Sequence, residues 1–223
     1  MCGRFSLTVG DRDIATEWNV HVPFDIPARY NIAPSQPVVV LLDDGERRLE
    51  QFQWGLVPHW AKDPKIGSRM INARAETLFE KPAFRGPARR QRCLVLADGF
   101  YEWRKPNGGR KVPHYIRLKS GRPFGFAGIW ARWEGGDGEL MTCSIVTTEP
   151  NELMRRLHDR MPVIVPKDLE DRWLDPELGD PETLEAILKP YPADEMEHYA
   201  VSTVVNNPKH DAAECVQPAS PLV

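Results

Sequence analysis

The chain has 223 residues, of which 41% are hydrophobic and 27% charged, and its formal net charge is −3. This composition is typical of a soluble globular protein of one or two domains. No apolar run approaches the roughly 20 residues that span a bilayer, and the N-terminus MCGRFSLTVGDRD lacks the features of a secretory signal. We therefore expect an intracellular, cytoplasmic protein without a membrane partner.

The four cysteines are widely spread and include no C-x-x-C pair: Cys2, Cys93, Cys143 and Cys215. A disulfide framework is not expected in a cytosolic chain of this size. A zinc site is not expected either, because no Cys/His pair has ligand spacing. We predict no metal and no cofactor, and we interpret Cys93 and Cys143 as small buried hydrophobic residues in strands.

Charge is distributed unevenly along the chain. Residues 81–111 hold nine basic residues against two acidic ones, and residues 168–197 hold eleven acidic residues against two basic ones. The first segment indicates a surface that attracts phosphates. The alternative is that each run is a solvated face.

In chain order, the first elements are a short helix and a hairpin. Residues 11–18 have a helical pattern. The stretch PVVVLLDDGERRLEQFQW, residues 37–54, predicts two strands joined by a turn at Asp44-Gly45. A second short helix is expected over residues 75–81. RCLVLADGFYEW, residues 92–103, indicates a buried strand, a turn at Asp98-Gly99 and a second strand.

The second half of the chain contains further predicted strands and helices. Residues 114–133 predict a hairpin that turns at Ser120-Gly121-Arg122, and residues 140–148 and 198–205 predict β-branched strands. A helix is expected over residues 150–157. Another should run from Pro181 through Leu188, with Asp180 as its N-cap.

Strands therefore outnumber helices and do not alternate with them as in a parallel sheet. We predict an α+β fold over residues 1–223, a single domain built on an antiparallel, barrel-like sheet with flanking short helices.

Position 2 carries the most informative chemistry. The small residues Cys2 and Gly3 after Met1 are compatible with removal of the initiator methionine. The product is a 1,2-aminothiol whose amine has an ordinary pKa of about 7.7–8.0 and whose thiol has one of about 8.5. Such a group condenses with an aldehyde to an imine and then closes to a thiazolidine. The alternative is an ordinary residue near a frayed chain end.

Other candidate residues lie downstream, each with a structural alternative. In MINARAET, Asn72 and Arg74 share one face if the segment is extended, where they can orient the cysteine and hold a phosphate; otherwise they are a capping Asn and a surface Arg. Glu102 lies among aromatic residues, which raise a carboxyl pKa toward the range of proton transfer, unless it points to solvent. His158 is either a general acid or a helix-capping histidine.

Cationic and aromatic residues complete the pattern. Arg4, Trp54, Trp60 and Trp103 can stack unpaired bases beside a basic groove. Tryptophans are as often part of a core.

Taken together, the sequence resembles the SOS response-associated peptidase (SRAP) family, also called the abasic-site-processing family. Seven stretches in family order carry the resemblance: MCGRF (1–5), RYNIAPSQ (29–36), WGLVPHW (54–60), INARAET (71–77), ADGFYEW (97–103), HDRMPVIV (158–165) and VNNPKHD (205–211).

The resemblance implies the SRAP fold and a DNA-repair function. Family members form a thiazolidine crosslink between the N-terminal cysteine and an abasic site in single-stranded DNA, which shields the lesion. By motif, Cys2 is the nucleophile, Asn72 positions it, Glu102 assists proton transfers and His158 helps to open the deoxyribose ring. The resemblance further implies self-catalysed Met1 removal.

The implied DNA-binding residues are Arg4, Arg74, Pro34, Trp60 and Trp103. We expect a monomer that associates with the nucleoid when it is bound to DNA.

Two other functions fit part of the sequence. Amidotransferases of the N-terminal nucleophile class also begin with Met-Cys-Gly, and their cysteine attacks the glutamine amide. A non-catalytic reader of modified DNA bases needs the groove but not a free N-terminal cysteine.

Overall fold

Five strands close into a barrel in the computed structural model, which describes residues 2–105, 109–135 and 138–219. They are β3 (Pro37–Asp43), β4 (Arg47–Trp54), β6 (Arg92–Ala97), β9 (Phe124–Gly135) and β10 (Gly138–Thr148). The pairings run β4-β3-β6-β9-β10, and β10 returns to β4, so the ring has no open edge. Only the β10–β4 pairing within the ring is parallel. The predicted α+β, barrel-like fold is confirmed.

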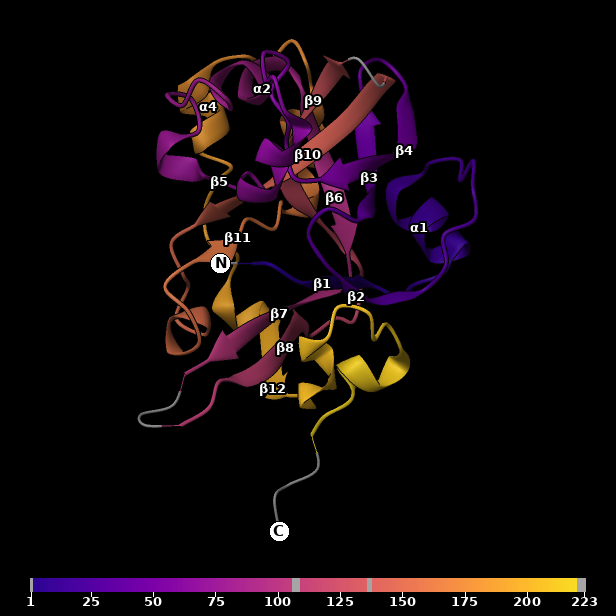
Figure 1. The fold of residues 1–223 in the computed structure, drawn as a ribbon, viewed down its shortest axis with the longest axis vertical. Coiled ribbons are helices and arrows are strands. Elements are labelled where there is room, and N and C mark those ends of the chain that lie inside the picture. The colour runs from indigo at the N-terminus through magenta and orange to yellow at the C-terminus, as the bar shows by residue number, and fades with distance from the viewer. Residues whose placement is uncertain (1, 106–108, 136–137, 220–223) are drawn as a thin grey trace.

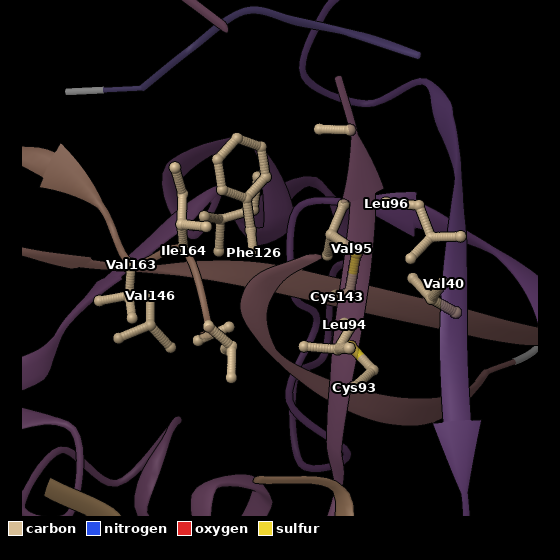
Figure 2. Packing of buried hydrophobic residues seen from close by; sticks show 14 of the residues in the cluster. Val40, Cys93, Leu94, Val95, Leu96, Phe126, Cys143, Val146, Val163 and Ile164 are labelled. Carbon is tan, nitrogen blue, oxygen red and sulfur yellow. The ribbon is translucent and has the colours of Figure 1, made fainter. Parts of the chain in front are cut away.

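The barrel interior is filled by apolar side chains (Figure 2). All six residues of β6 are buried, and so are Cys93 and Cys143, as predicted. Close packing explains Gly128 on β9, because a Cβ there would lie 2.7 Å from Cys93 Sγ.

A second, antiparallel sheet lies against the barrel. Its strand order is β12 (Met196–Ala200), β8 (Val112–Leu118), β7 (Gly99–Arg104), β1 (Phe5–Leu7) and β2 (Arg29–Ile32). Its strand β1 lies between β7 and the barrel in Figure 1. One face meets the barrel through Phe100, whose ring lies 5.9 Å from that of Phe126. The other face carries a separate cluster around Tyr101 and Tyr115. Alternate residues of β7 therefore face the barrel side and the outer cluster.

Strand β10 extends beyond the barrel and gathers two more short strands. β5 (Asn72–Arg74) runs parallel to residues 145–147, and β11 (Met161–Pro162) runs antiparallel to residues 147–148. These additions bring segments 71–77 and 158–165 to one end of β10.

The helices are short: α1 (Asp11–Trp18), α2 (Arg85–Arg90), α3 (Glu170–Leu174) and α4 (Pro181–Glu185). Short 3-10 helices occupy Pro64–Arg69, Ala75–Thr77, Met154–Arg156, Lys167–Leu169, Ala193–Glu195, Thr203–Asn206 and Ala213–Val216. The prediction of α1 is confirmed, and so is the Asp180 cap, because Asp180 Oδ2 accepts a 2.9 Å hydrogen bond from Thr183 N.

Several local predictions were wrong. The helices expected over 75–81 and 150–157 are single 3-10 turns, and α4 ends at Glu185. Segments this short barely recover the cost of helix nucleation. The strand expected over 198–205 ends at Ala200, after which the chain turns at Thr203–Asn206.

The hairpin predicted over 114–133 does not form, although both of its strands do. β8 pairs with β7 and β12, whereas β9 pairs with β6 and β10. Both edges of β9 are already occupied within the barrel, so β8 joins the other sheet. Residues 92–103 behave similarly: the turn at Asp98-Gly99 carries the chain from the barrel to the second sheet.

Candidate active site

Cys2 lies three residues before β1, inside the protein. Tyr101 N donates a 3.0 Å hydrogen bond to Arg4 O, and Phe5 is in register with Phe100, so residues 2–4 run beside residues 101–103. The Cys2 side chain is fully buried, and its Sγ lies 4.0 Å from Arg4 O. Met1, whose removal we predict, is outside the described residues.

Asp98 anchors the N-terminal strand to the β6–β7 junction. Its carboxylate accepts hydrogen bonds of 2.6 Å from Ser6 Oγ, 2.6 Å from Thr8 Oγ1 and 3.2 Å from Val9 N. The Tyr115 hydroxyl lies 2.8 Å from Ser6 Oγ and fits only because residue 99 is glycine. This buried network fixes the register that places Cys2 beside Glu102.

Asn72 reaches Cys2 from β5. Its Nδ2 donates a 2.8 Å hydrogen bond to Cys2 O, which links residues 70 positions apart. Its buried Oδ1 accepts no hydrogen bond from the residues that the structure describes. That oxygen is therefore an acceptor with free hydrogen-bonding capacity on the residue that binds Cys2.

Glu102 is buried on β7, with 3% of its surface exposed. Burial raises the pKa of its carboxyl above the ordinary 4.5, and an electrostatic interaction with His158 opposes this shift. Burial, followed by the negative charge of Glu102, raises the pKa of the Cys2 thiol. The solvent-facing alternative for Glu102 is thereby excluded.

His158 follows the 3-10 turn Met154–Arg156, and its backbone N donates a 2.8 Å hydrogen bond to Met154 O. Its Nδ1 lies 3.0 Å from Arg160 N and 2.7 Å from Asp159 Oδ1. An unprotonated Nδ1 accepts from Arg160 N, and a protonated one donates to Asp159. Cys2, Asn72, Glu102 and His158 thus form one connected group, joined by a hydrogen bond and by electrostatic interactions.

Arg4 and Trp103 lie together beside this group. Arg4 Nη1 donates to Asn31 Oδ1 at 2.6 Å and to Val205 O at 2.7 Å, and its guanidinium lies 5.7 Å from the Trp103 ring centroid. Burial lowers the pKa of Arg4. These contacts fix the position of the Arg4 side chain. Phosphate binding by Arg4 stays a prediction.

Two motifs of the sequence have structural roles that the sequence did not indicate. Asp211 Oδ1 accepts hydrogen bonds from Tyr30 N and Asn31 N, at 2.5 and 2.9 Å. Asn31 Nδ2 donates to Val205 O, Asn207 O and His210 O. These hydrogen bonds join residues 29–31 to residues 205–211. Asn31 and Val205, which belong to the two segments, also bind Arg4.

The remaining predicted DNA-binding residues lie on exposed segments. Arg74 is exposed at the end of β5, on the same side of the strand as Asn72. Trp60 is 52% exposed on a turn closed by a hydrogen bond from Ala61 N to Pro58 O. Pro34 is half-buried, and the next residue donates from Ser35 N to Trp54 O at 2.8 Å, which ties the loop to the start of the Trp60 segment.

An ion pair that sequence reasoning missed joins two of the functional segments. Arg160 Nη1 lies 2.5 Å from Glu76 Oε1, and Nη2 lies 3.0 Å from Oε2. Arg160 Nη2 also donates to Thr147 O at 2.6 Å. Both residues stand in the motifs INARAET and HDRMPVIV, which is the only signal that pointed to them. The pair ties the segment of Asn72 to that of His158.

Among the described residues, no cluster of three or more His, Cys, Asp or Glu side chains is arranged to hold a metal ion. Within the same residues, every helix is too short or too polar to cross a membrane.

Comparisons with known proteins identify the family of the chain. The family model described as SOS response associated peptidase (SRAP) matches residues 1–208. The abasic site processing protein YoaM of Bacillus subtilis (strain 168) is 48% identical over 219 residues, which cover 96% of each chain. The abasic site processing protein HMCES of Rattus norvegicus is 34% identical over 234 residues, which cover 87% of this chain and 66% of the relative.

A solved structure has the same architecture. A crystal structure of a protein from Bacteroides thetaiotaomicron superposes with a TM-score of 0.89 at 29% identity, and the match covers 98% of this chain and 100% of that one.

Proposed function

The chain belongs to the SOS response-associated peptidase (SRAP) family, and on this premise we propose that it processes abasic sites through a covalent bond to Cys2. The bond forms in single-stranded DNA after Met1 has been removed. Its product is a thiazolidine that protects the lesion. Relatives named abasic site processing proteins support the substrate.

The observation that carries the proposal is the hydrogen bond from Asn72 Nδ2 to Cys2 O, beside buried Glu102. The bond fixes the backbone of the residue that supplies both nucleophiles. Asn72 Oδ1, which accepts nothing from the described residues, is suited to the Cys2 amine. Burial raises the pKa of the Glu102 carboxyl, which suits a group that takes up and releases protons.

The chemistry proceeds in balanced steps. Hydrolysis of the Met1–Cys2 peptide bond consumes one water and exposes the amine. The amine adds to the abasic aldehyde, and loss of one water gives the imine. The Cys2 sulfur then adds to the imine carbon while the thiol proton passes to the nitrogen, which closes the ring. Ring closure removes the imine, which would otherwise promote β-elimination of the 3′ phosphate.

Glu102, His158 and Asn72 each have one role. Glu102 carries the proton between sulfur and nitrogen. His158 protonates the ring oxygen of the closed deoxyribose, so that the aldehyde is exposed. Asn72 positions Cys2, because its amide can bind the carbonyl and the amine of the same residue.

The half-buried residues Arg4, Pro34 and Trp103 and the exposed residues Arg74 and Trp60 bind the strand. Arg4 and Arg74 contact the phosphates that flank the lesion. Pro34, Trp60 and Trp103 shape the groove and stack bases. Single-stranded DNA is preferred because no opposing strand has to be unstacked.

Intact-mass spectrometry of the protein mixed with abasic single-stranded DNA tests the proposal. The expected adduct has the mass of the Met1-free protein plus the DNA, minus one water, and it forms without borohydride. An adduct that needs borohydride would indicate an imine without ring closure. Ammonia release from glutamine without any adduct would favour the amidotransferase, and binding without an adduct would favour the reader.

A further inference from the structure

A hollow of about 510 Å³ lies between the Trp60 turn and α2. Its walls include Pro58, Trp60, Arg85, Gln91 and Arg132. Helix α2 lies at the end of the barrel away from β7 and β8 (Figure 1). The hollow is therefore distinct from the group around Cys2, but it shares Trp60 with the proposed DNA groove.

The walls of the hollow are held by hydrogen bonds. Ala61 N donates a 2.9 Å hydrogen bond to Pro58 O, which closes the Trp60 turn, and Trp133 Nε1 donates to Ala61 O at 2.8 Å. On the opposite side, Trp130 N donates to Gln91 O at 2.8 Å. The shape is therefore formed before a ligand arrives, which lowers the entropic cost of binding.

The chemistry of the walls suits a nucleotide. Arg85 and Arg132 supply cations on either side, and Trp60 supplies an exposed aromatic surface. None of the residues around the hollow is acidic. Arg132 is partly compensated by Glu134 and Glu139, at 2.9 and 2.8 Å, so Arg85 is the stronger site for an anion.

The basic character continues beyond the hollow. Residues 81–92 contain five basic residues and no acidic one: Lys81, Arg85, Arg89, Arg90 and Arg92. Arg92 is buried and donates to backbone oxygens, but Lys81, Arg85, Arg89 and Arg90 are exposed. This side of α2 attracts a polyanion along its length.

We propose that the hollow is a second nucleotide subsite, which binds a phosphate and a base of the same DNA strand outside the lesion. The base stacks on Trp60, and the phosphate contacts Arg85 and Arg132. Trp60 lines the hollow, and the proposed function also assigns it to the groove around the lesion, so a strand that passes over Trp60 would reach the hollow. The inference rests on the proposed function for the identity of the strand.

Binding of undamaged single-stranded DNA of two lengths tests the subsite. A strand of about 5 nucleotides fills one groove, and a strand of about 15 extends beyond it. Fluorescence anisotropy at several salt concentrations gives Kd and its salt dependence for both strands. We expect Arg85→Ala to reduce the gain in affinity from the short to the long strand by about threefold to tenfold, and to lower the salt slope for the long strand by about 0.7.

Matched variants separate charge from structure. Arg85→Lys keeps the charge and should restore most of the gain. Lys119→Ala, on the loop between β8 and β9, removes an exposed cation elsewhere and should match the wild-type protein. The subsite is refuted if Arg85→Ala and the double variant Arg85→Ala/Arg132→Ala both keep the wild-type gain and salt slope.

Covalent capture is scored separately, with the wild-type protein and a short abasic strand on a denaturing gel. If the wild-type protein forms a crosslink but the variants keep the gain in affinity from the short to the long strand, the subsite alone is refuted. A reduced length effect without a crosslink supports the subsite and refutes the covalent function.

Discussion

Asn72 Nδ2 binds Cys2 O at 2.8 Å, although β5 and β1 lie in different sheets. The two segments meet because β5 extends the barrel along β10, while β1 pairs with β7 in the second sheet. Cys2 thus lies at the junction of the two sheets, where one side supplies Asn72 and the other supplies Glu102. This arrangement fixes the position of Cys2, the nucleophile of the proposed function.

Asn72→Ala should slow crosslinking by about 100-fold, because the nucleophile loses its positioning contact. The loss of one hydrogen bond should lower the free energy of unfolding by only about 1 kcal/mol. Single-turnover gel assays and thermal unfolding measure the two effects. Ser68→Ala, which removes a hydrogen bond to Lys65 O on an exposed turn, is the control. A rate for Asn72→Ala within threefold of wild type would refute the positioning role.

Glu102→Gln should abolish most crosslinking but stabilise the protein at pH 8. Burial raises the pKa of Glu102, so ionisation costs more in the folded protein than in the unfolded chain. Wild-type stability therefore falls as the pH rises above 4.5 through the folded pKa, whereas glutamine stays neutral. The increase in Tm should be a few degrees at pH 8 and vanish near pH 4, as measured by calorimetry.

Glu76→Gln is the matched control with the opposite sign. The hydrogen bond from Arg160 holds the pKa of Glu76 below its ordinary value. The stability that Glu76 contributes is present above pH 4.5 and is lost as the pH falls through the folded pKa. The variant should thus be less stable than wild type at pH 8 and equal to it at low pH. Glu102→Gln with no pH-dependent gain would contradict the account of Glu102.

His158→Gln should slow capture of a natural abasic site, which is mostly a closed hemiacetal, by about 10- to 100-fold. Capture of an acyclic aldehyde at the same position of the strand should change little, because no ring has to be opened. Rates on the two strands, measured side by side, check the role. Equal losses on both would place His158 in a later step.

Arg4→Ala and Arg74→Ala should differ in stability while both weaken DNA binding. Arg4→Ala leaves buried Asn31 Oδ1 and Val205 O without this donor and should cost about 3 kcal/mol, or roughly 6–12 °C in Tm. Arg74 is exposed, so its variant should stay within about 0.5 kcal/mol of wild type. Calorimetry and anisotropy separate the two effects. An Arg4→Ala variant as stable as wild type would contradict the network.

Much of the fold followed from local sequence. The hairpin at Asp44-Gly45 formed as predicted because alternating apolar residues and the turn specify the same pairing. Both strands predicted over 114–133 also form, but they do not pair with each other. Pairing between distant strands depends on which edges remain free, and the sequence around residue 114 does not contain that information.

The sequence predicted the central residues of the site but not the contacts that support them. Cys2, Asn72, Glu102 and His158 were chosen from motifs, and the structure brings them together. The supporting contacts were not predicted, because Asp98, Asn31 and Asp211 act on backbone groups far along the chain. Such contacts arise only when the sheets assemble.

Denaturing electrophoresis tests the central claim most directly. The protein is mixed with uracil-containing single-stranded DNA, with and without uracil glycosylase, beside a Cys2→Ala control. We predict a heat-stable shifted band only with wild-type protein and glycosylase-treated DNA. The absence of that band, from protein whose intact mass confirms an exposed Cys2, would contradict covalent capture of abasic sites.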